Sequence, residues 1–364
     1  MAELIFLIIV LVVVLGFTYT NGFHDAANAI ATVVSTKVLT PRQAVIMAAI
    51  MNFIGALGGV AVAKTIGAGM VDKNFITVYT VFCAMVAGII WNVTTWYFGI
   101  PSSSSHALIG GLLGAAVASA RNNWHVILWS YQKTDPKTGH VALDGVYPKV
   151  IVPMISSPIF GFIGAFVIMG IIFAIIRSWR PFWVNRIFGK AQLFSAGYMG
   201  WAHGFADGQK TMGIMALALF AASKSVDWQQ VPAIFSFLHT PKFEISTWVK
   251  WSCGLTMAMG TYIGGWRIIH TLGHKLVRIK PVHGFAAECT GATLLAIAGS
   301  LGMPISTTHS ITTSIMGVGC ARRFSALNYT WVERILWTWI LTIPATGALA
   351  YGFMYLMSAA GWAR

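Results

Sequence analysis

The stretch FGIPSSSSH, from Phe98 to His106, is repeated as LGMPISTTH from Leu301 to His309. In both copies a long apolar segment ends at a proline, and hydroxyl residues that close on a histidine follow it. A glycine lies 13 residues before the proline in each copy. Chance seldom repeats a motif of this length together with its spacing, so the two stretches indicate two copies of one structural unit.

The composition is that of an integral membrane protein. Of 364 residues, 57% are hydrophobic and 9% are charged, whereas soluble chains carry about 25% charged residues. We expect an all-α integral membrane protein with about ten to twelve transmembrane helices, each needing about 20 apolar residues. The main apolar stretches are Leu4–Tyr19, Ala44–Ala63, Phe75–Phe98, Val150–Ile176, Val249–Ile269, Phe285–Met303 and Ile335–Met357.

Two further pairs of segments follow the same order along the chain. KTIGAGMV at Lys64–Val71 matches HTLGHKLV at His270–Val277, and GFHDAAN at Gly22–Asn28 matches GFADGQK at Gly204–Lys210. Three matches in one order identify an internal duplication. We expect one membrane domain made of repeat 1 in residues 1–120, connecting loops and a linking transmembrane helix in 121–190, and repeat 2 in 191–364.

The net charge of +14 comes largely from basic loops. The basic residues are not interleaved with aromatic ones on a surface that could bind nucleic acid, so the expected surroundings are a lipid bilayer and no nucleic-acid partner. Cytoplasmic loops are enriched in Lys and Arg, which places two acid-free loops in the cytoplasm. Their basic residues are Arg177, Arg180, Arg186 and Lys190 in one, and Arg267, Lys275, Arg278 and Lys280 in the other.

The charge of matched loops suggests how the two copies are oriented. The loop around Lys64–Lys73 is lightly charged and includes Asp72, whereas its partner around Arg267–Lys280 is strongly basic. Opposite sides of the membrane would explain this difference. We therefore expect two inverted repeats, an architecture that many secondary transporters share.

Three of the ten acidic residues, Asp25, Asp207 and Glu288, lie inside or at the mouth of apolar segments, and the other seven lie in termini or polar loops. An Asp near the bilayer centre costs roughly 2.5 to 3.5 kcal/mol on insertion scales, so it faces a cavity, a partner or an ion path. A structural salt bridge from Asp207 to Lys210 is one alternative. Because Asp25 and Asp207 occupy matching positions, we favour sites for a coupling ion.

Glycines flank both aspartates. Asn21-Gly22 and Gly204 weaken a continuous helix. We therefore expect each GF-x-D stretch to be the break in a discontinuous helix, where backbone carbonyls and a carboxylate hold a cation near the membrane midplane.

The hydroxyl runs after Pro101 and Pro304 lead into short apolar helices, expected over Ala107–Ala120 and Ile311–Cys320. Neither is long enough to cross a bilayer alone, so both are expected to be re-entrant half-helices with N-cap hydroxyls in the membrane interior. Such helix N-termini bind anions. Serine and threonine also mediate ordinary helix packing in membranes, but a duplicated run favours a site that clasps one tetrahedral oxyanion.

Four further side chains are candidates for this site. His106 and His309 close the hydroxyl runs and are expected either to cap them or to shuttle protons. Gln209 and Lys210 stand beside a buried acid, where an anionic substrate would help to neutralise the lysine. The four cysteines, Cys83, Cys253, Cys289 and Cys320, stand singly without CxxC spacing, so neither a metal centre nor another cofactor is expected.

Four motifs together, GFHDAANAIAT, WYFGIPSSSSHALIG, HGFADGQKTMGI and GMPISTTHS, resemble the inorganic phosphate transporter (Pit) family from Gly22 to Ser310. The form HG-x-x-DGQK is similar to the bacterial low-affinity, proton-coupled branch, whereas sodium-coupled relatives tend to carry a second ND-x-x-NA there. The resemblance implies a multi-pass protein of the bacterial inner (plasma) membrane. It would import inorganic phosphate, alone or as a neutral complex with a divalent metal, by symport with H+ or alternatively Na+.

The resemblance also implies roles for particular residues. Asp25 and Asn28 match the first signature, Asp207 matches the second, and Glu288 matches an acid that many relatives carry ahead of the second loop. The expected coupling-ion or proton residues are Asp25, Asp207, Glu288, His106 and His309. The expected phosphate ligands are Asn28, Ser103, Ser104, Ser105, Gln209, Lys210, Ser306, Thr307 and Thr308.

Two departures from the family pattern matter. Ala206 stands where the family usually has Asn, which removes a polar ligand beside Asp207. The long hydrophilic loop that many relatives insert between the halves is reduced to roughly Arg177–Lys190. The oligomeric state, a homodimer included, is left open by the sequence.

Two other functions fit parts of the sequence. A carrier of sulfate or another oxyanion would use the same hydroxyls and N–H groups. A membrane hydrolase could use serine and histidine, but the Ser/Thr-His element is duplicated and no GxSxG nucleophile elbow is present. We therefore expect a transporter and not an enzyme.

Overall fold

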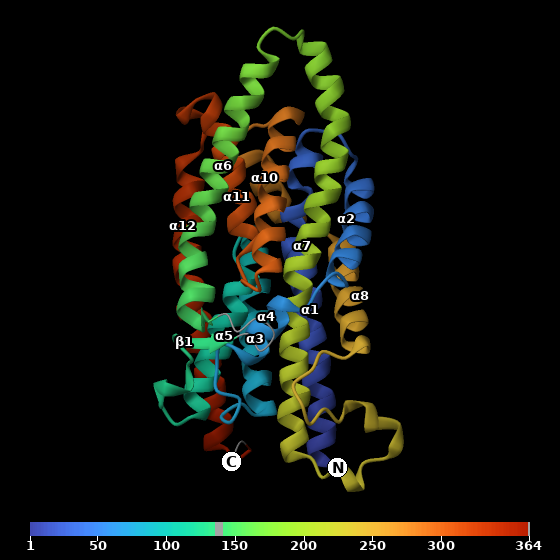
Figure 1. Cartoon of the computed structure of the whole chain (residues 1–364), viewed down its shortest axis with the longest axis vertical. Coiled ribbons are helices and arrows are strands. Elements are labelled where there is room, and N and C mark those ends of the chain that lie inside the picture. The colour runs from blue at the N-terminus through green and yellow to red at the C-terminus, as the bar shows by residue number, and fades with distance from the viewer. Residues whose placement is uncertain (135–140, 363–364) are drawn as a thin grey trace.

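The computed structural model describes residues 1–134 and 141–362, which form a long bundle of helices (Figure 1). The prediction of an all-α membrane protein is confirmed. The first half of the chain forms α1 (Ala2–Ser35), α2 (Pro41–Ala56), α3 (Ala61–Ala68), α4 (Val78–Phe98) and α5 (Ser104–Ser119). α6 (Val152–Ile176) is the last helix of the first half. The second half forms α7 (Pro181–Ser225), α8 (Thr247–Ile263), α9 (Trp266–His270), α10 (Pro281–Ser300), α11 (Thr307–Arg322) and α12 (Tyr329–Ala359).

Short elements connect these helices. Two strands, β1 (Tyr131–Thr134) and β2 (Val141–Asp144), pair antiparallel with Tyr131 opposite Asp144. Two segments are π-helical: η2 (Tyr147–Ile151) precedes α6, and η5 (Thr271–Lys275) follows α9. Four 3-10 turns complete the described residues: η1 (Trp124–Val126), η3 (Trp228–Gln230), η4 (Ala233–Leu238) and η6 (Phe324–Ala326).

Four helical segments of the described chain are long and apolar enough to span a membrane by themselves. They are α1, α4, α12 and the continuous segment Tyr147–Ile176. The pair α2 and α3 would make a fifth, bent by 70°. This is fewer than the ten to twelve helices expected, because α5 and α11 have only 16 residues each and α7 and α10 bury many polar side chains. The number of crossings therefore stays a prediction.

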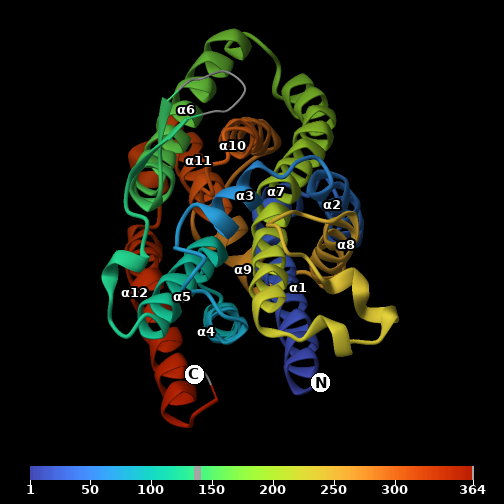
Figure 2. The same ribbon diagram turned by 60° about the horizontal axis from the view of Figure 1, so that its bottom comes forward.

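Helices in matching positions of the two halves make matching contacts. The contact of α1 with α4 corresponds to that of α7 with α10, and α1 with α8 corresponds to α7 with α2. The last helix of each half crosses over, so that α6 packs on α11 and α12 packs on α5 (Figure 2). α1 and α7 run in opposite directions through the bundle (Figure 1). This arrangement supports inversion, while the boundaries 1–120, 121–190 and 191–364 stay a prediction.

The expected helix breaks at the two GF-x-D stretches are wrong. α1 is continuous through Gly22 and Asp25, and α7 is continuous through Gly204 and Asp207. The glycines serve close packing instead. A Cβ on Gly22 would collide with the Met257 carbonyl oxygen of α8, and a Cβ on Gly204 would collide with the backbone of α2. Glycine thus lowers helix propensity here but lets two backbones touch.

Both half-helices follow the proline loops, but they begin within the hydroxyl runs, at Ser104 and Thr307, three and four residues before the expected starts at Ala107 and Ile311. Gly99 and Gly302 lie in the left-handed region, at φ 65° and 66°, which ends the preceding helix and favours glycine. Ser103 then caps α5 and Ser306 caps α11. At about 1.5 Å per residue each half-helix is about 24 Å long, short of the ~30 Å hydrocarbon core.

The apolar core is divided in two along the bundle. One cluster gathers the start of α1, from Leu4 to Phe17, with α4, α5 and the end of α7. The other gathers the later part of α1, from Ala27 to Val33, with the start of α7 and with α10 and α11. Polar residues of α1 and α7 are buried between the two clusters. The fold therefore holds a polar layer at mid-length, between two apolar ones.

Candidate functional site

The N-termini of α5 and α11 meet in this polar layer. The Ser103 hydroxyl accepts the N–H of His106, and the Ser306 hydroxyl accepts the N–H of His309, both at 3.1 Å. The first helical turns leave further N–H groups without an intrahelical partner. The hydroxyl of Ser104 has no hydrogen-bond partner among the described residues. Two capped helix N-termini with spare donors therefore face one region.

α1 joins this region through Asn28 and Asp25. Asn28 Nδ2 donates to the hydroxyls of Thr308 at 2.9 Å and Thr307 at 3.2 Å. Thr308 in turn donates to Asp25 Oδ1 at 3.4 Å. His24 Nδ1 lies 2.7 Å from Asp25 Oδ1. The other carboxylate oxygen, Oδ2, has no partner among the described residues, so one oxygen of Asp25 is left for a ligand.

α7 joins it through Lys210 and Asp207. Lys210 Nζ lies 2.6 Å from Asp207 Oδ1 and 2.7 Å from the Ile305 carbonyl oxygen, and it also donates to the Ser105 hydroxyl. Thr307 donates to Asp207 Oδ2 at 3.2 Å. The salt bridge that the sequence offered as an alternative is thus present. Its ammonium nevertheless stands between the two half-helices.

The contacts of α1 and α7 are related by the duplication. Asn28 and Lys210 occupy matching positions, as do Thr308 and Ser105. Asn28 contacts Thr308 on α11, and Lys210 contacts Ser105 on α5. Each long helix therefore reaches the half-helix of the opposite repeat, and the two repeats build one site together.

The site includes a residue that sequence reasoning did not assign, His203. Its Nδ1 lies 2.9 Å from Asn52 Oδ1, and Asn52 donates its own amide to Thr261 at 2.9 Å. Nδ1 must therefore be the donor, and a neutral ring turns the bare lone pair of Nε2 toward Asp207 Oδ2, 3.4 Å away. Within the part of the chain that the structure describes, Nε2 has no hydrogen-bond partner. The signal was available, since His203 lies four residues before Asp207 and so on the same helix face.

Asp25, His203 and Asp207 form a buried cluster. One possible ligand atom from each lies within 4.8 Å of the other two. Two acceptors, His203 Nε2 and Asp207 Oδ2, face one another there at 3.4 Å. Such an arrangement is repulsive unless a proton or another cation lies between them. The residues present thus fit a cation.

Three expected site residues lie apart from this centre. The Gln209 amide donates to the Phe205 carbonyl at 2.7 Å and accepts the Val62 N–H at 2.9 Å, so it holds the start of α3. The His106 and His309 rings touch each other edge to face, with centroids 4.7 Å apart, and His309 stacks on Trp339. The histidines therefore lie behind the half-helix N-termini.

Glu288 belongs to a second polar cluster, away from the other acids. Its carboxylate accepts from the Thr32 hydroxyl at 2.5 Å, from Gln192 Nε2 at 3.0 Å and from the Ser195 hydroxyl. Thr32 lies seven residues, or two turns, beyond Asp25 on α1. Three donors satisfy this buried acid, and no cation pairs with it among the described residues.

The centre is closed to solvent on all sides in this structure. No member of the centre is more than 3% exposed: Asp25, Asn28, Ser103, Ser104, Ser105, His203, Asp207, Lys210, Ser306, Thr307 and Thr308. Charges confined here interact in a low dielectric, so imbalance among them is costly. Two carboxylates and one ammonium leave one net negative charge when His203 and His24, which is paired with Asp25, are both neutral.

The chain is similar in sequence and in fold to known proteins. A model of the "Phosphate transporter family" matches residues 21–350. A "Probable low-affinity inorganic phosphate transporter" of Bacillus subtilis is 40% identical, over 96% of this chain and 97% of that protein. One of Rhizobium meliloti is 41% identical, over 93% and 92%. A solved structure titled "The sodium-dependent phosphate transporter" superimposes with a TM-score of 0.79 at 22% identity, covering 97% of this chain and 99% of that one.

Proposed function

This chain belongs to the phosphate transporter family, and we propose that it imports inorganic phosphate by symport with a proton, across the plasma membrane of a bacterium. The family is one of transporters and not of enzymes, and the chain is a multi-pass membrane protein. Membership of the family does not specify the coupling ion, the direction of transport or the residues that bind phosphate and the coupling ion. Those three points are the proposal.

One observation carries the proposal, namely that two half-helix N-termini meet around a buried lysine. Helix N-termini offer N–H groups and a positive dipole to an anion. The hydroxyls of Ser104, Ser105 and Thr307 stand beside them. A tetrahedral phosphate between α5 and α11 would take these donors together with the ammonium of Lys210. Lys210 would then exchange part of its contact with Asp207 for the phosphate.

The net charge of the centre supports symport. With His24 and His203 neutral the site holds one excess negative charge, and a phosphate anion adds more; with either ring charged, the phosphate alone supplies the excess. Uncompensated charge in a buried site is strongly unfavourable. A cation must therefore enter with the phosphate, and the cluster of Asp25, His203 and Asp207 is where we place it.

The donor set of that cluster favours a proton. A proton on His203 Nε2 would turn the facing acceptors into a charge-assisted hydrogen bond to Asp207. Hard metal cations such as Mg2+ prefer a shell made entirely of oxygens, and His203 presents nitrogen. Sodium is the alternative, as in the solved structure's title, but a likeness at 22% identity concerns the fold alone.

Other finer points remain part of the proposal. The cation could also arrive as a divalent metal that accompanies phosphate as a neutral complex, with Asp25 Oδ2 as its open ligand. Sulfate is the competing oxyanion. Glu288, His106 and His309 are proposed as secondary proton sites, and a homodimer stays a prediction.

Uptake by the purified protein in liposomes tests the proposal. Radiolabelled phosphate uptake is measured with an inward proton gradient and no sodium, and then with an inward sodium gradient at equal pH. We expect uptake in the first case and no stimulation in the second. Uptake that needs sodium overturns proton coupling, and full inhibition by equimolar sulfate overturns selectivity for phosphate.

A further inference from the structure

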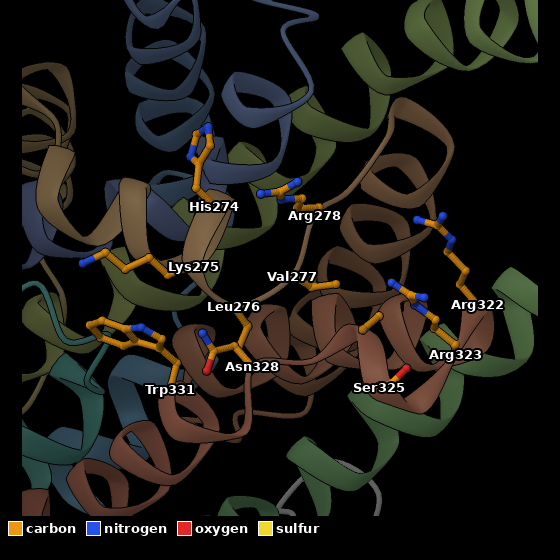
Figure 3. Close-up of a pocket in the computed structure, with 11 residues that line it drawn as sticks. His274, Lys275, Leu276, Val277, Arg278, Arg322, Arg323, Ser325, Asn328 and Trp331 are labelled. Carbon is orange, nitrogen blue, oxygen red and sulfur yellow. The ribbon is translucent and has the colours of Figure 1, made fainter.

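A pocket of about 580 Å³ lies outside the transport site (Figure 3). It is lined by the end of η5 and the link after it, from His274 to Arg278, by the end of α11, and by η6 and the start of α12. None of the proposed phosphate or coupling residues lines it. Its volume falls within the roughly 300 to 1,000 Å³ that small-molecule sites occupy.

The lining is strongly basic. Lys275, Arg278, Arg322 and Arg323 contribute four cations, all exposed, and His274 adds an imidazole. Within residues 1–134 and 141–362, none of these side chains lies within 4.0 Å of a carboxylate. The lining residues include no acid. The positive potential of the pocket is therefore not neutralised by the protein.

Two features of α12 complete the pocket. Its N-cap residue, Asn328, makes no side-chain capping bond, so the helix presents its positive end uncapped. Trp331 supports the cluster, with Lys275 Nζ lying 4.5 Å from the centre of its ring. Cation–π contact of this kind steadies a lysine that has no anionic partner.

The pocket stands at the basic end of the bundle. Arg177, which follows α6, and Lys280, which precedes α10, line one neighbouring pocket together with Arg322. The two acid-free loops thus lie at the same end, which the positive-inside rule assigns to the cytoplasm. Anionic lipid headgroups and free phosphate are both present on that side.

We propose that this pocket binds a phosphate group at the cytoplasmic face, carried either by an anionic phospholipid headgroup or by free inorganic phosphate. Arginine guanidinium groups bind phosphate oxygens in pairs, and basic pockets between membrane helices suit phospholipid headgroups. Arg322 ends α11, whose other end carries Thr307 and Thr308. A phosphate group here therefore steadies the half-helix that also builds the transport site.

The test compares two double variants of the full-length protein. Arg278→Gln with Arg323→Gln removes two cations that line this pocket and do not line the neighbouring pocket at Arg177 and Lys280. Arg186→Gln with Lys190→Gln removes two cations near the start of α7 and is the matched control. In one arm, detergent-purified protein is titrated with phosphatidylglycerol or phosphatidylcholine, and retained lipid is counted by native mass spectrometry. In the other, equilibrium dialysis counts bound inorganic phosphate without added lipid.

We expect the unmodified protein to retain phosphatidylglycerol, and the pocket variant to bind it about 30-fold more weakly, because each Lys or Arg is worth about fivefold near an anionic headgroup. Loss of a second bound phosphate from the pocket variant alone would support the proposal with free phosphate as the source. If the pocket variant matches the control in both arms, the proposal is overturned. The single variant Arg323→Gln repeats the test, and phosphate binding at the central site reports folding independently.

Discussion

Asp25 and Asp207 occupy matching positions in the duplicated sequence, but their partners differ. Asp207 is paired with Lys210 and accepts from Thr307, whereas Oδ2 of Asp25 has no partner in residues 1–134 and 141–362. The difference follows from the matched positions 28 and 210, where one repeat has an amide and the other an ammonium. Identical acids can therefore have different roles in one site.

The first prediction concerns these two acids. Asp25→Asn should abolish gradient-driven uptake, because an amide neither carries a proton nor balances a cation. Asp207→Asn should mainly weaken phosphate binding, since it frees Lys210 from its partner and misplaces it. Gradient-driven uptake and equilibrium phosphate binding are measured for both variants. Equal loss of coupling with binding retained in both would show that the acids are equivalent ion sites.

His203 gives a second prediction at this scale. His203→Gln keeps a polar side chain between Asn52 and Asp207 but cannot take up a proton. We expect proton-driven phosphate uptake to fall to background, while equilibrium phosphate binding persists. His125→Gln, on an exposed turn, is the control and should leave both unchanged. Proton-driven uptake by His203→Gln at the normal rate would contradict the role given to this histidine.

A third prediction concerns the hydroxyls at the N-termini of the half-helices. Ser104→Ala with Thr307→Ala should weaken phosphate binding about a hundredfold or more, because each hydrogen bond to a charged group is worth about 1.5 to 3 kcal/mol. Ser102→Ala with Thr313→Ala removes two buried hydroxyls that bond elsewhere, to Trp91 and to the backbone near His309. That control pair should bind phosphate normally. Calorimetry measures both, and unchanged binding in the first pair would refute the placement of phosphate.

At the scale of helices, glycine decides which backbones can touch. Gly22 and Gly204 let α1 approach α8 and α7 approach α2, and they lie one turn before Asp25 and Asp207 respectively. The polar layer is thus positioned by close packing beside it. The broken pair α2 and α3 is tied to α7 by Gln209. This explains why a residue expected to bind phosphate instead fixes a helix start.

A stability measurement tests the packing argument. Gly22→Ala should lower the free energy of unfolding by about 1 to 3 kcal/mol, the usual cost of overpacking, because its Cβ would meet the backbone of α8. Gly16→Ala, on the same helix, has only Ile89 Cδ1 nearby, at 3.7 Å. It should be neutral or slightly stabilising, since alanine favours helix over glycine. Thermal unfolding in detergent compares the two, and an equal effect would refute close packing at Gly22.

At the scale of the whole molecule, the two repeats, which we predict to be inverted, build one closed site. Each long helix contacts the half-helix of the other repeat, and α6 and α12 exchange places between the halves. The halves therefore depend on one another. The basic loops gather at one end of the resulting bundle, which fixes its orientation in the membrane.

Labelling from the two sides of the membrane tests this topology. In a chain whose four cysteines are replaced by alanine, Asn74→Cys, near Asp72, should react with an impermeant thiol reagent added to intact cells. Lys275→Cys should react only after permeabilisation. Both positions are exposed, so access depends on the side alone. Labelling of both from the same side would rule out inversion at these loops.

Several features were readable from the sequence because they are local or statistical. Apolar composition identifies a membrane protein, and repeated motifs identify a duplication. A hydroxyl cap ahead of each half-helix is predictable because Ser103 and Ser306 bond only three residues ahead, although the helices begin three and four residues before the expected positions. Such hydrogen bonds depend only on residues that are close together in the sequence. The signature acids were found for the same reason.

Other features depended on segments that meet only in the folded chain. Asn52 and His203 are 151 residues apart, and Lys210 and Ser105 are 105 apart. No local pattern specifies such contacts, because they follow from how helices pack. The same holds for Gly22. Its low helix propensity predicts a break, but in the fold it allows close packing of α1 against α8. Composition, repeated motifs and neighbouring residues thus predict the class, the duplication and the caps, whereas helix packing sets which buried groups face one another.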